Sequence, residues 1–344
     1  MAATPIADPT AYSELDMATK RHFMPIVVNQ LFTQSPILHR IFKPAQEGSW
    51  GLASPSFDGR AIVEPLETAE ATGTSGAYGT DDTWTFGSTE VLAGAHYTWK
   101  MYYAGVKIHN ANLAMNTGAA RIYDLAAIKL RNASKTLRKD LITDFYLATA
   151  DGNIKMVGMQ AFCAANLTVG GIAQGGNTYW QGYTEAISGD LTWEDLNEYY
   201  YKTKLYGDYD APTIFVTTDG AIENYEKWLT KVTTTGGGAL ASLPLVGIMG
   251  AADRQARTID GGFESFSFKR IPMVADPYCP SGMGFFINER YLHWRVLKQF
   301  QDTGWTQQRV NGNDWVQNTI FGYGALTSSC NKKHALMTGL TEIG

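Results

Sequence analysis

The chain has 344 residues, more than the roughly 250 to 300 at which one hydrophobic core usually stops growing, so we expect more than one lobe. Its 28 basic and 33 acidic residues give a net charge of -5, which argues against a dedicated nucleic-acid-binding protein. Charged residues make up only 18%, where about 25% is typical, and this indicates surface used for contacts with other chains.

The cysteines and the apolar segments exclude several other classes. Cys163, Cys279 and Cys330 lie far apart and form no CxxC pair, so neither a disulfide framework nor a zinc site is indicated, and a reducing cytoplasm is expected. The N-terminus lacks the basic and apolar regions of a secretory signal. The most apolar window, residues 239–252, is too short to cross a bilayer and contains Pro244. We expect a soluble, non-secreted protein without membrane contact.

Residues 1–48 are interpreted as an N-terminal arm. A short helical pattern over residues 15–32, interrupted at Pro25, runs into an extended stretch that contains Ser35, Pro36 and Pro44. These residues have too few apolar positions for a core of their own. We therefore expect the segment to lie against another surface.

The pattern of residues 49–108 predicts a long β-hairpin. Aromatic and β-branched residues flank residues 68–83, a run of small and polar residues without a large aliphatic side chain. With about 18 residues on each side at about 3.3 Å per residue, the hairpin would reach about 60 Å, further than a compact domain needs. Between Trp50 and Lys100 the only cation is Arg60, whereas the acidic residues are Asp58, Glu64, Glu67, Glu70, Asp81, Asp82 and Glu90.

The clearest helix follows, over residues 117–150. Its apolar residues recur at spacings of three and four and so form one face: Ile122, Ala126, Leu130, Ala133, Leu137, Leu141 and Phe145. About 33 residues at about 1.5 Å per residue predict about 50 Å of helix. Arg131, Lys135 and Arg138 project opposite that face. Spacing alone favours a solvated charged face, but an acidic hairpin directly before a basic helix also suggests two surfaces that meet, within one molecule or between copies.

The rest of the chain mixes helices and strands. Residues 191–205 predict a helix opened by the capping pair Thr192 and Asp195, and residues 213–229 predict a buried strand followed by a helix. Residues 263–274 predict one strand, which leads through a proline-glycine turn over residues 276–282 to extended structure at 285–287. Two long extended stretches around Asn311 and Gly312 predict a hairpin near the C-terminus.

Motifs for catalysis and metal binding are mostly missing. No HExxH or HxH occurs among the scattered histidines, which are His22, His39, His96, His109, His293 and His334. Glu223 with Glu226, or Asp81 with Asp82, could supply the carboxylates of a glycoside hydrolase, but such helical pairs are usually solvated and such loop aspartates usually cap turns. We predict no enzyme activity, no catalytic residue, no cofactor and no metal. A cytoplasmic hydrolase is the alternative from another class.

The order of these elements resembles the major capsid proteins of tailed bacteriophages, which have the Hong Kong 97 capsid fold. The resemblance covers nearly the whole chain. It is carried by the strand and turn through Val274-Ala275-Asp276-Pro277-Tyr278-Cys279-Pro280-Ser281-Gly282, by the strand and helix of residues 213–229, and by the closing His334-Ala335-Leu336-Met337. It implies an α+β fold with an N-terminal arm, a long extended β-hairpin loop, a long spine helix, a peripheral domain and an axial domain.

The resemblance also implies a domain division and a function. We expect an N-terminal arm (1–48), an extended loop (49–108), a peripheral domain with the spine helix (109–150 and 296–333) and an axial domain (151–295 and 334–344). The implied role is a major capsid protein that self-assembles in the bacterial host cytoplasm, as pentamers and hexamers, into an icosahedral head around double-stranded DNA. The implied partners are a separate scaffolding protein, a portal protein, a decoration or cement protein, and the packaged DNA through non-specific contact. An encapsulin-type shell that packages an enzyme is the alternative within this fold.

On this resemblance, the acidic loop of one copy would cross the basic helix of the next, with aromatic side chains supplying most of the adhesion. The residues proposed for this contact are Glu64, Glu67, Glu70, Asp81, Asp82, Trp84, Phe86, Arg131, Lys135 and Arg138. The competing role for the three basic residues is to face packaged DNA. No lysine lies between Lys43 and Lys100, so the lysine-to-asparagine cross-link of some family members is not expected. An arm of 48 residues is also too short for the built-in scaffold of about a hundred residues that other members carry.

Overall fold

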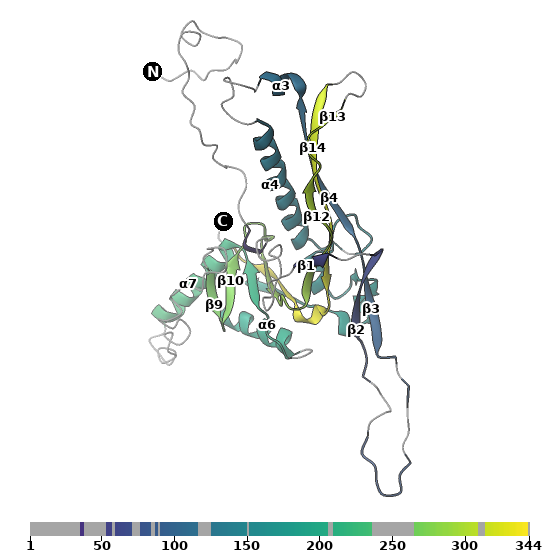
Figure 1. Cartoon of the computed structure of the whole chain (residues 1–344). Helices are drawn as coiled ribbons and strands as arrows, with labels where there is room; N and C mark the ends of the chain where they lie inside the picture. The colour runs from purple at the N-terminus through teal and green to yellow at the C-terminus, as the bar shows by residue number, and fades with distance from the viewer. Residues whose placement is uncertain are drawn as a thin grey trace.

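The computed structural model of the chain describes residues 35–37, 53–56, 59–70, 76–83, 87–88, 90–115, 125–149, 151–205, 209–235, 265–308 and 314–342. These residues form an elongated molecule in which a helix-covered sheet, a second sheet with its own helices and a projecting hairpin are arranged along one long axis (Figure 1).

A sheet of five strands forms one end of the molecule. Its central strand is β14, Trp315–Ser328, which pairs antiparallel along one edge with β12, Leu292–Asp302, and with β13, Thr306–Gln308. Along its other edge β14 pairs antiparallel with β4, Lys100–His109. The strand β1, Ala53–Ser56, adds a parallel edge on β12.

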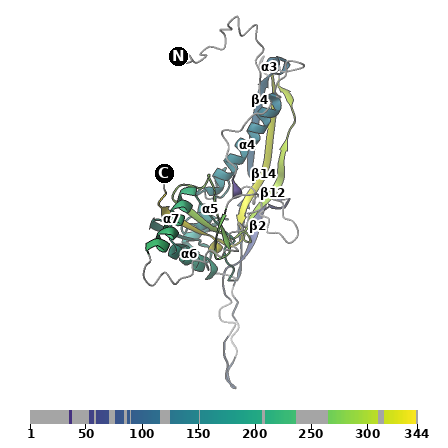
Figure 2. The same ribbon diagram turned by 90° about the vertical axis from the view of Figure 1, so that its left-hand side faces the viewer.

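Helix α4, Leu125–Tyr146, covers one face of this sheet, and α3, Asn110–Met115, follows β4 at the far end (Figures 1 and 2). The buried side of α4 ends in Leu137, Leu141 and Phe145. A buried polar contact joins helix to sheet, because the Tyr102 hydroxyl of β4 donates to Asp144 Oδ2 at 3.0 Å.

The prediction of a helix over residues 117–150 is confirmed from Leu125 to Tyr146, and residues 116–124 lie outside the described part of the chain. The predicted apolar face is also confirmed. Its last members are fully buried, and Ala126, Leu130 and Ala133 nearer the start are half-buried. The described helix has 22 residues, so at about 1.5 Å per residue it is about 33 Å long rather than about 50 Å.

The second sheet has six strands in the order β7-β15-β11-β8-β10-β9. Their bounds are β7 Tyr183–Gly189, β8 Ile214–Thr217, β9 Ser265–Phe268, β10 Ile271–Ala275, β11 Met283–Ile287 and β15 Ala335–Leu340. All four residues of β8 are buried, as expected for a strand covered on both faces. Helices α6, Trp193–Leu205, and α7, Asp219–Thr235, accompany this sheet (Figure 1).

Short elements connect the two sheets. The hairpin of β2, Ala61–Glu67, and β3, Leu92–Thr98, stands at the side of the molecule, and β5, Thr168–Val169, pairs with β6, Ile172–Ala173. The remaining helical turns are α5 Met159–Cys163, η2 Gln174–Gly176, η3 Thr178–Trp180 and η4 Asn331–Lys333. None of the described helices is both long and apolar enough to cross a membrane.

Several local predictions are confirmed. Helix α6 opens with the predicted capping pair, since Asp195 N donates to Thr192 Oγ1 at 3.3 Å and Thr192 N donates to Asp195 Oδ2 at 3.1 Å. The predicted buried strand is β8, and the helix after it is α7, which already begins at Asp219.

The prediction of a single strand over residues 263–274 is wrong. Residues Ser265–Phe268 and Ile271–Ala275 are two strands that pair antiparallel around a turn of Lys269 and Arg270. Both turn residues have positive φ, 48° and 70°, which is the backbone of a two-residue hairpin turn normally formed by Asn and Gly. Lysine and arginine give no such signal in a sequence.

The extent of the predicted long hairpin is also wrong. The residues Met101, Tyr102 and Tyr103 belong to β4, which pairs with β14 and not with the strand before the loop. The regular hairpin is therefore the pairing of β2 with β3, from Ala61 opposite Thr98 to Glu67 opposite Leu92. We call residues 61–98 the hairpin arm.

Of the predicted N-terminal arm, only residues 35–37 are described, and they are buried. Asp276, at the end of β10, holds them in place. Its Oδ2 accepts hydrogen bonds from Ser35 Oγ at 2.5 Å and from the Tyr146 hydroxyl at 3.0 Å. Ser35, the end of α4 and the turn after β10 therefore meet at one buried carboxylate, whose pKa is raised by burial. The rest of the predicted arm lies outside the described residues.

Candidate functional site

The hairpin arm is attached to the body through one face of its two strands. Exposure alternates along β2, so that Ile62, Glu64 and Leu66 point inward, while Ala95 and Tyr97 are the buried residues of β3. The Tyr97 hydroxyl donates to the carbonyl of Ser328 at 3.0 Å, and its burial raises the Tyr97 pKa. His96 N donates to the Gly170 carbonyl at 2.7 Å. The arm therefore leaves the body from a rigid base.

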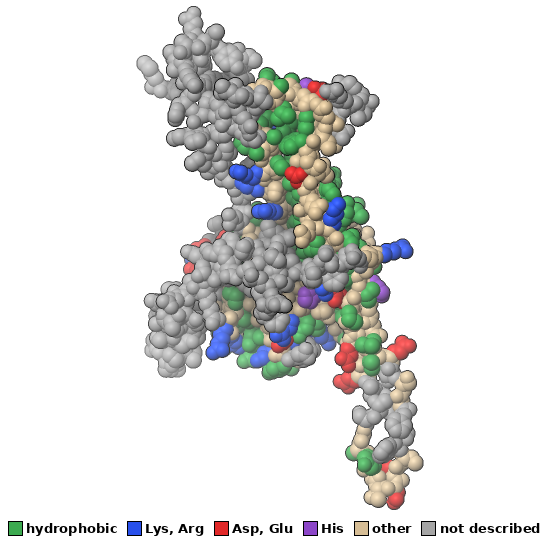
Figure 3. All heavy atoms as spheres, viewed as in Figure 1, with side chains coloured by type: hydrophobic (Ala, Val, Ile, Leu, Met, Phe, Trp, Pro, Cys, Tyr) green, Lys and Arg blue, Asp and Glu red, His purple; other side chains and the backbone are tan. Residues whose placement is uncertain are grey.

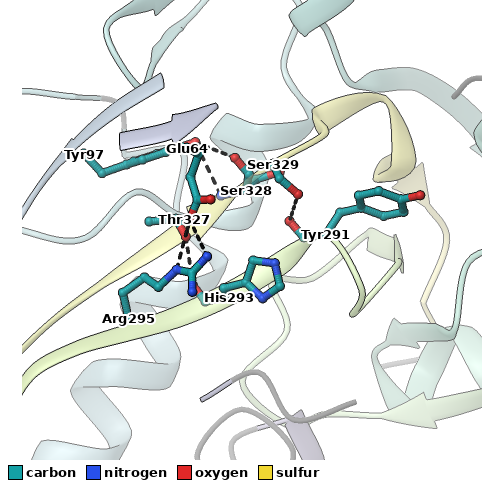
Figure 4. Close-up of polar contacts among 8 residues, drawn as sticks. All are labelled: Glu64, Tyr97, Tyr291, His293, Arg295, Thr327, Ser328 and Ser329. Carbon is teal, nitrogen blue, oxygen red and sulfur yellow. Dashed lines mark hydrogen bonds and ion pairs between the residues drawn. The ribbon is translucent and has the colours of Figure 1, made fainter. Parts of the chain in front are cut away.

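A buried ion pair lies at the centre of this base (Figure 4). Glu64 Oε1 accepts hydrogen bonds from Arg295 Nη2 at 2.8 Å, from Arg295 Nε at 3.0 Å and from Thr327 Oγ1 at 2.9 Å. The side chains of Arg295 and Glu64 are only 17% and 8% exposed. His293 lies beside the pair, and its pKa is lowered by burial and then by Arg295.

The structure therefore assigns Glu64 an intramolecular role that the sequence did not predict. Its carboxylate faces the body and is already paired, so it is not available to a neighbouring copy. Arg295 and Thr327, about 230 to 260 residues away along the chain, carry no local signal of this contact. Only the buried position of an acidic residue in the alternating pattern of β2 hints that a partner is needed.

The other predicted carboxylates lie further out on the hairpin arm and are exposed: Glu67, Glu70, Asp81 and Asp82. Figure 3 shows acidic side chains where the arm leaves the body and again at its far end. Asp82 also shapes the tip, because its Oδ2 accepts a hydrogen bond from Gly79 N in a tight turn. Trp84 and Phe86 lie outside the described residues.

The three predicted basic residues lie on α4. Arg131 and Arg138 are exposed, and Lys135 is half-buried. The arm and α4 extend towards opposite ends of the molecule in both views (Figures 1 and 2). The structure thus does not bring the acidic and basic residues together within one chain.

A cavity with a volume of about 530 Å³ lies between β7, the start of α6 and Trp228 and is a candidate for a catalytic site. Three of its four carboxylates are engaged, since Asp195 caps α6 and Glu185 and Glu198 lie 3.7 and 2.8 Å from Lys202 Nζ; the fourth, Asp190, is exposed. Glu223, from the carboxylate pair considered for a hydrolase, pairs with Lys227 on the surface of α7. Among the described residues, no group of three His, Cys, Asp or Glu side chains could hold a metal ion.

Comparison with known proteins identifies the fold. No protein-family model and no curated protein sequence matches the chain. The capsid subunit of cyanophage A-1(L) is similar in structure, with a TM-score of 0.66 and 14% identity, over 95% of this chain and 98% of that one. The capsid of the Myoviridae phage XM1 matches with a TM-score of 0.58 and 11% identity, over 97% and 100% of the two chains.

An encapsulin shares the same architecture. The shell protein of the holo-SrpI encapsulin complex from Synechococcus elongatus matches with a TM-score of 0.56 and 12% identity, over 96% of each chain. The chain therefore has the fold of tailed-phage capsid proteins and encapsulins over nearly its whole length. The fold resemblance inferred from the sequence is confirmed.

Proposed function

We propose that this chain is a shell subunit, and specifically the major capsid protein of a tailed bacteriophage. In this proposal it assembles in the host cytoplasm, as pentamers and hexamers, into an icosahedral head that encloses double-stranded DNA. The observation that carries the proposal is the capsid fold matched along almost the full length of both chains, together with a hairpin arm that projects away from the body beyond its base.

The hairpin arm supports assembly on physical grounds. Along its length it presents exposed apolar side chains, with Leu92 74%, Tyr78 67% and Val63 51% exposed. Exposed apolar groups and free strand edges on a projecting hairpin favour contact with another chain. A neighbouring copy would bury them.

Charge narrows the choice of partner surface. The arm, residues 61–98, contains six carboxylates and no Lys or Arg, so its counterpart should be cationic. One cationic surface is the exposed side of α4 with Arg131, Lys135 and Arg138, as the sequence suggested. The competing role of these three basic residues is to contact packaged DNA non-specifically through its phosphates.

Other partners follow from the same proposal. A portal protein and a separate scaffolding protein are the proposed partners of such a head; a decoration or cement protein is a further candidate. The match to an encapsulin makes a cellular shell with an enzyme cargo the second candidate function. In neither case does the chain itself act as an enzyme.

Negative-stain electron microscopy with light scattering on the purified chain tests the proposal. We expect closed particles, or rings that close when a scaffold is added. A monomer or dimer that ignores concentration, salt and scaffold would refute it. Particles that co-purify with one protein cargo from the producing cell, and that package no DNA, would favour the encapsulin alternative.

A further inference from the structure

Among the described residues, three that are not glycine have positive φ, and they meet on one surface. They are Tyr209 at 59°, Lys269 at 48° and Arg270 at 70°. Lys269 and Arg270 form the turn between β9 and β10, and Tyr209 follows the end of α6. A residue with a side chain rarely adopts this backbone, and positions that keep it gather at functional sites.

Contacts between lysines and tyrosines join these residues to α6. Lys204 Nζ lies 4.6 Å from the ring centre of Tyr209 and 5.7 Å from that of Tyr200. Lys269 Nζ lies 4.7 Å from the ring centre of Tyr200 and 4.1 Å from that of Tyr201. The turn between β9 and β10 and the segment after α6 therefore meet at the C-terminal part of α6.

We call this surface the tyrosine-lysine patch and define it by Tyr201, Lys204, Leu205, Tyr209, Lys269 and Arg270. Its apolar members are largely uncovered, with Leu205 64%, Tyr209 60% and Tyr201 50% exposed. Figure 3 shows basic and hydrophobic side chains side by side over α6, at the lower edge of the second sheet. Exposed apolar groups gathered in one place are typical of an interaction surface.

The tyrosine-lysine patch is also cationic. None of Lys204, Lys269 and Arg270 forms an ion pair with a described residue. Three carboxylates in and after α6 are engaged with other residues: Asp195, Glu198 and Asp210. Glu194 acts on Tyr225 of α7, whose pKa is raised to about 12 by burial and then by this carboxylate. The three cations therefore have no anionic partner among the described residues.

We infer that the tyrosine-lysine patch binds an acidic polypeptide segment of a second protein, one that carries apolar side chains beside its carboxylates. The unpaired cations require the carboxylates, and Leu205 with the exposed tyrosines requires the apolar groups. This partner goes beyond the proposed shell function and does not depend on it, because the patch is complete within one chain.

A nucleic acid fits the patch less well than carboxylates do. Stacking of a base needs a free ring face, but Lys269 lies over the rings of Tyr200 and Tyr201. Lys204 lies over the ring of Tyr209 in the same way. Tyr200 also packs edge-on against Tyr201, with ring centres 5.3 Å apart. An ammonium group held over a ring still has N–H groups to donate to a carboxylate.

Fluorescence anisotropy on the unassembled full-length chain tests the inference with defined probes. The main probe is a labelled synthetic helical peptide of about five turns, with Leu on one face and Glu elsewhere. We expect it to bind, with an affinity that falls as salt is added. The same peptide with Ser in place of Leu should bind about tenfold more weakly, since the apolar contacts are lost. Single-stranded and duplex DNA are the competing probes.

Matched pairs of basic residues locate the binding site. Lys204→Gln with Arg270→Gln should weaken binding of the acidic peptide by about tenfold, because two attractions are lost. Arg131→Gln with Arg138→Gln removes the same charge from exposed positions of α4, and should leave the affinity within about twofold.

Matched leucines test the apolar part of the patch. Leu205→Asn should weaken binding of the acidic peptide by about fivefold, whereas Leu92→Asn, at an exposed leucine of the hairpin arm, should leave it within about twofold. Unfolding midpoints of all variants check that each chain still folds.

Several results would overturn the inference. They are no binding of the acidic peptide, equal losses for the two basic pairs, and DNA binding that is tighter than peptide binding and is lost in the patch variants. If the patch variants instead prevent the purified chain from assembling by itself, the occupant is a second copy. Because binding is measured on unassembled chains, a failure of shell assembly refutes only the proposed function, and a failure of peptide binding refutes only this inference.

Discussion

Glu64 is a carboxylate at the base of the hairpin arm that is removed from water and paired with Arg295 and Thr327. Burying a charge is costly unless its partners replace the lost hydration, so both side chains depend on each other. Because β2 is in the arm and Arg295 is in β12, this pair fixes the arm to the five-stranded sheet. Within its own chain, its role is to orient the arm.

Substitution of one partner of this ion pair should therefore destabilise the chain much more than substitution of both partners. Arg295→Ala leaves the Glu64 carboxylate buried with Thr327 as its remaining side-chain donor, and should lower the free energy of unfolding by about 3 kcal/mol. Glu64→Gln with Arg295→Met should recover part of that loss. Denaturant unfolding of unassembled chains measures both, with Lys227→Ala, at an exposed ion pair with Glu223, as a control that changes little. Equal losses for the single and double variants would contradict this account.

His334 makes stability depend on pH. It is fully buried; its Nδ1 accepts a hydrogen bond from Asn288 N at 3.3 Å, and its Nε2 has no partner among the described residues. Burial, with a smaller contribution from His293, lowers its pKa from 6.5 to about 3. The folded chain therefore holds this imidazole neutral where the unfolded chain would protonate it.

Because of this difference, the folded chain should lose stability as the pH falls. A depressed histidine pKa leaves stability intact above about pH 6.5 and removes it as the pH falls towards about 3, by an amount on the order of 4 kcal/mol. His334→Asn keeps an acceptor for Asn288 N but cannot be protonated, so it should flatten the loss of stability over this range. Denaturant unfolding at a series of pH values measures the slope. The exposed His96→Asn is the control; if it flattens the slope as much as His334→Asn does, the assignment is wrong.

At the scale of elements, the turn between β9 and β10 shows a conflict between backbone and side chain. Arg270 has φ of 70°, a conformation that costs a non-glycine residue roughly 1 kcal/mol. Lys269 has the same type of backbone, but its Nζ lies 4.1 Å from the ring centre of Tyr201 and 4.7 Å from that of Tyr200. The lysine thus holds the turn against α6.

The two turn residues should therefore respond in opposite ways to glycine. Arg270→Gly should stabilise the chain by about 0.5 kcal/mol, since relief of strain slightly exceeds the greater entropy of glycine in the unfolded chain. Lys269→Gly should destabilise it, by about 1 kcal/mol, because the contacts with the aromatic rings are lost. Unfolding midpoints of the two variants, measured side by side, test this. A destabilising Arg270→Gly would show that the arginine side chain matters more than its backbone.

Elements with a local signal could be predicted from the sequence, and elements defined by distant pairing could not. The spacing of apolar residues in α4 and the Thr192 and Asp195 cap of α6 are local, and both are confirmed. The assignment of residues 101–103 failed because β4 is separated from its partner β14 by about two hundred residues, and nothing in its own pattern names that partner.

In the candidate site, too, contacts between residues far apart in the sequence could not be predicted. Composition indicated that residues 61–98 are acidic and that α4 is basic, and both statements hold. The sequence could not show that Glu64 faces Arg295, since their contact exists only after β2 packs beside β12 and β14. The pairing of Tyr103 with Phe321 escaped notice for a related reason, since these residues become neighbours only through the register of β4 on β14.

At the scale of the whole molecule, the body and the outer part of the hairpin arm are separable. Among the described residues of the arm, the hydrogen bonds and buried side chains that attach it to the body belong to its base, between Ala61 opposite Thr98 and Glu67 opposite Leu92. Thr68 N still donates to the Val91 carbonyl at 2.8 Å, one step beyond that pairing. Residues further out along the arm should add little to the stability of the isolated chain.

Excision of the outer arm should therefore abolish assembly without unfolding the subunit. Replacement of residues 69–90 by an Asn-Gly turn joins Thr68 to Val91 with a two-residue link that suits antiparallel strands. The Glu64 and Arg295 pair and the register of β2 on β3 remain, so the unfolding midpoint should change by no more than a few degrees, about the effect of 0.5 kcal/mol or less. Loss of the exposed apolar and acidic groups should prevent closed particles at any salt concentration, with or without scaffold. Electron microscopy and calorimetry on the same sample decide the matter: particles from the shortened chain would show that the arm is dispensable, and a large drop in stability would show that the arm supports its own subunit.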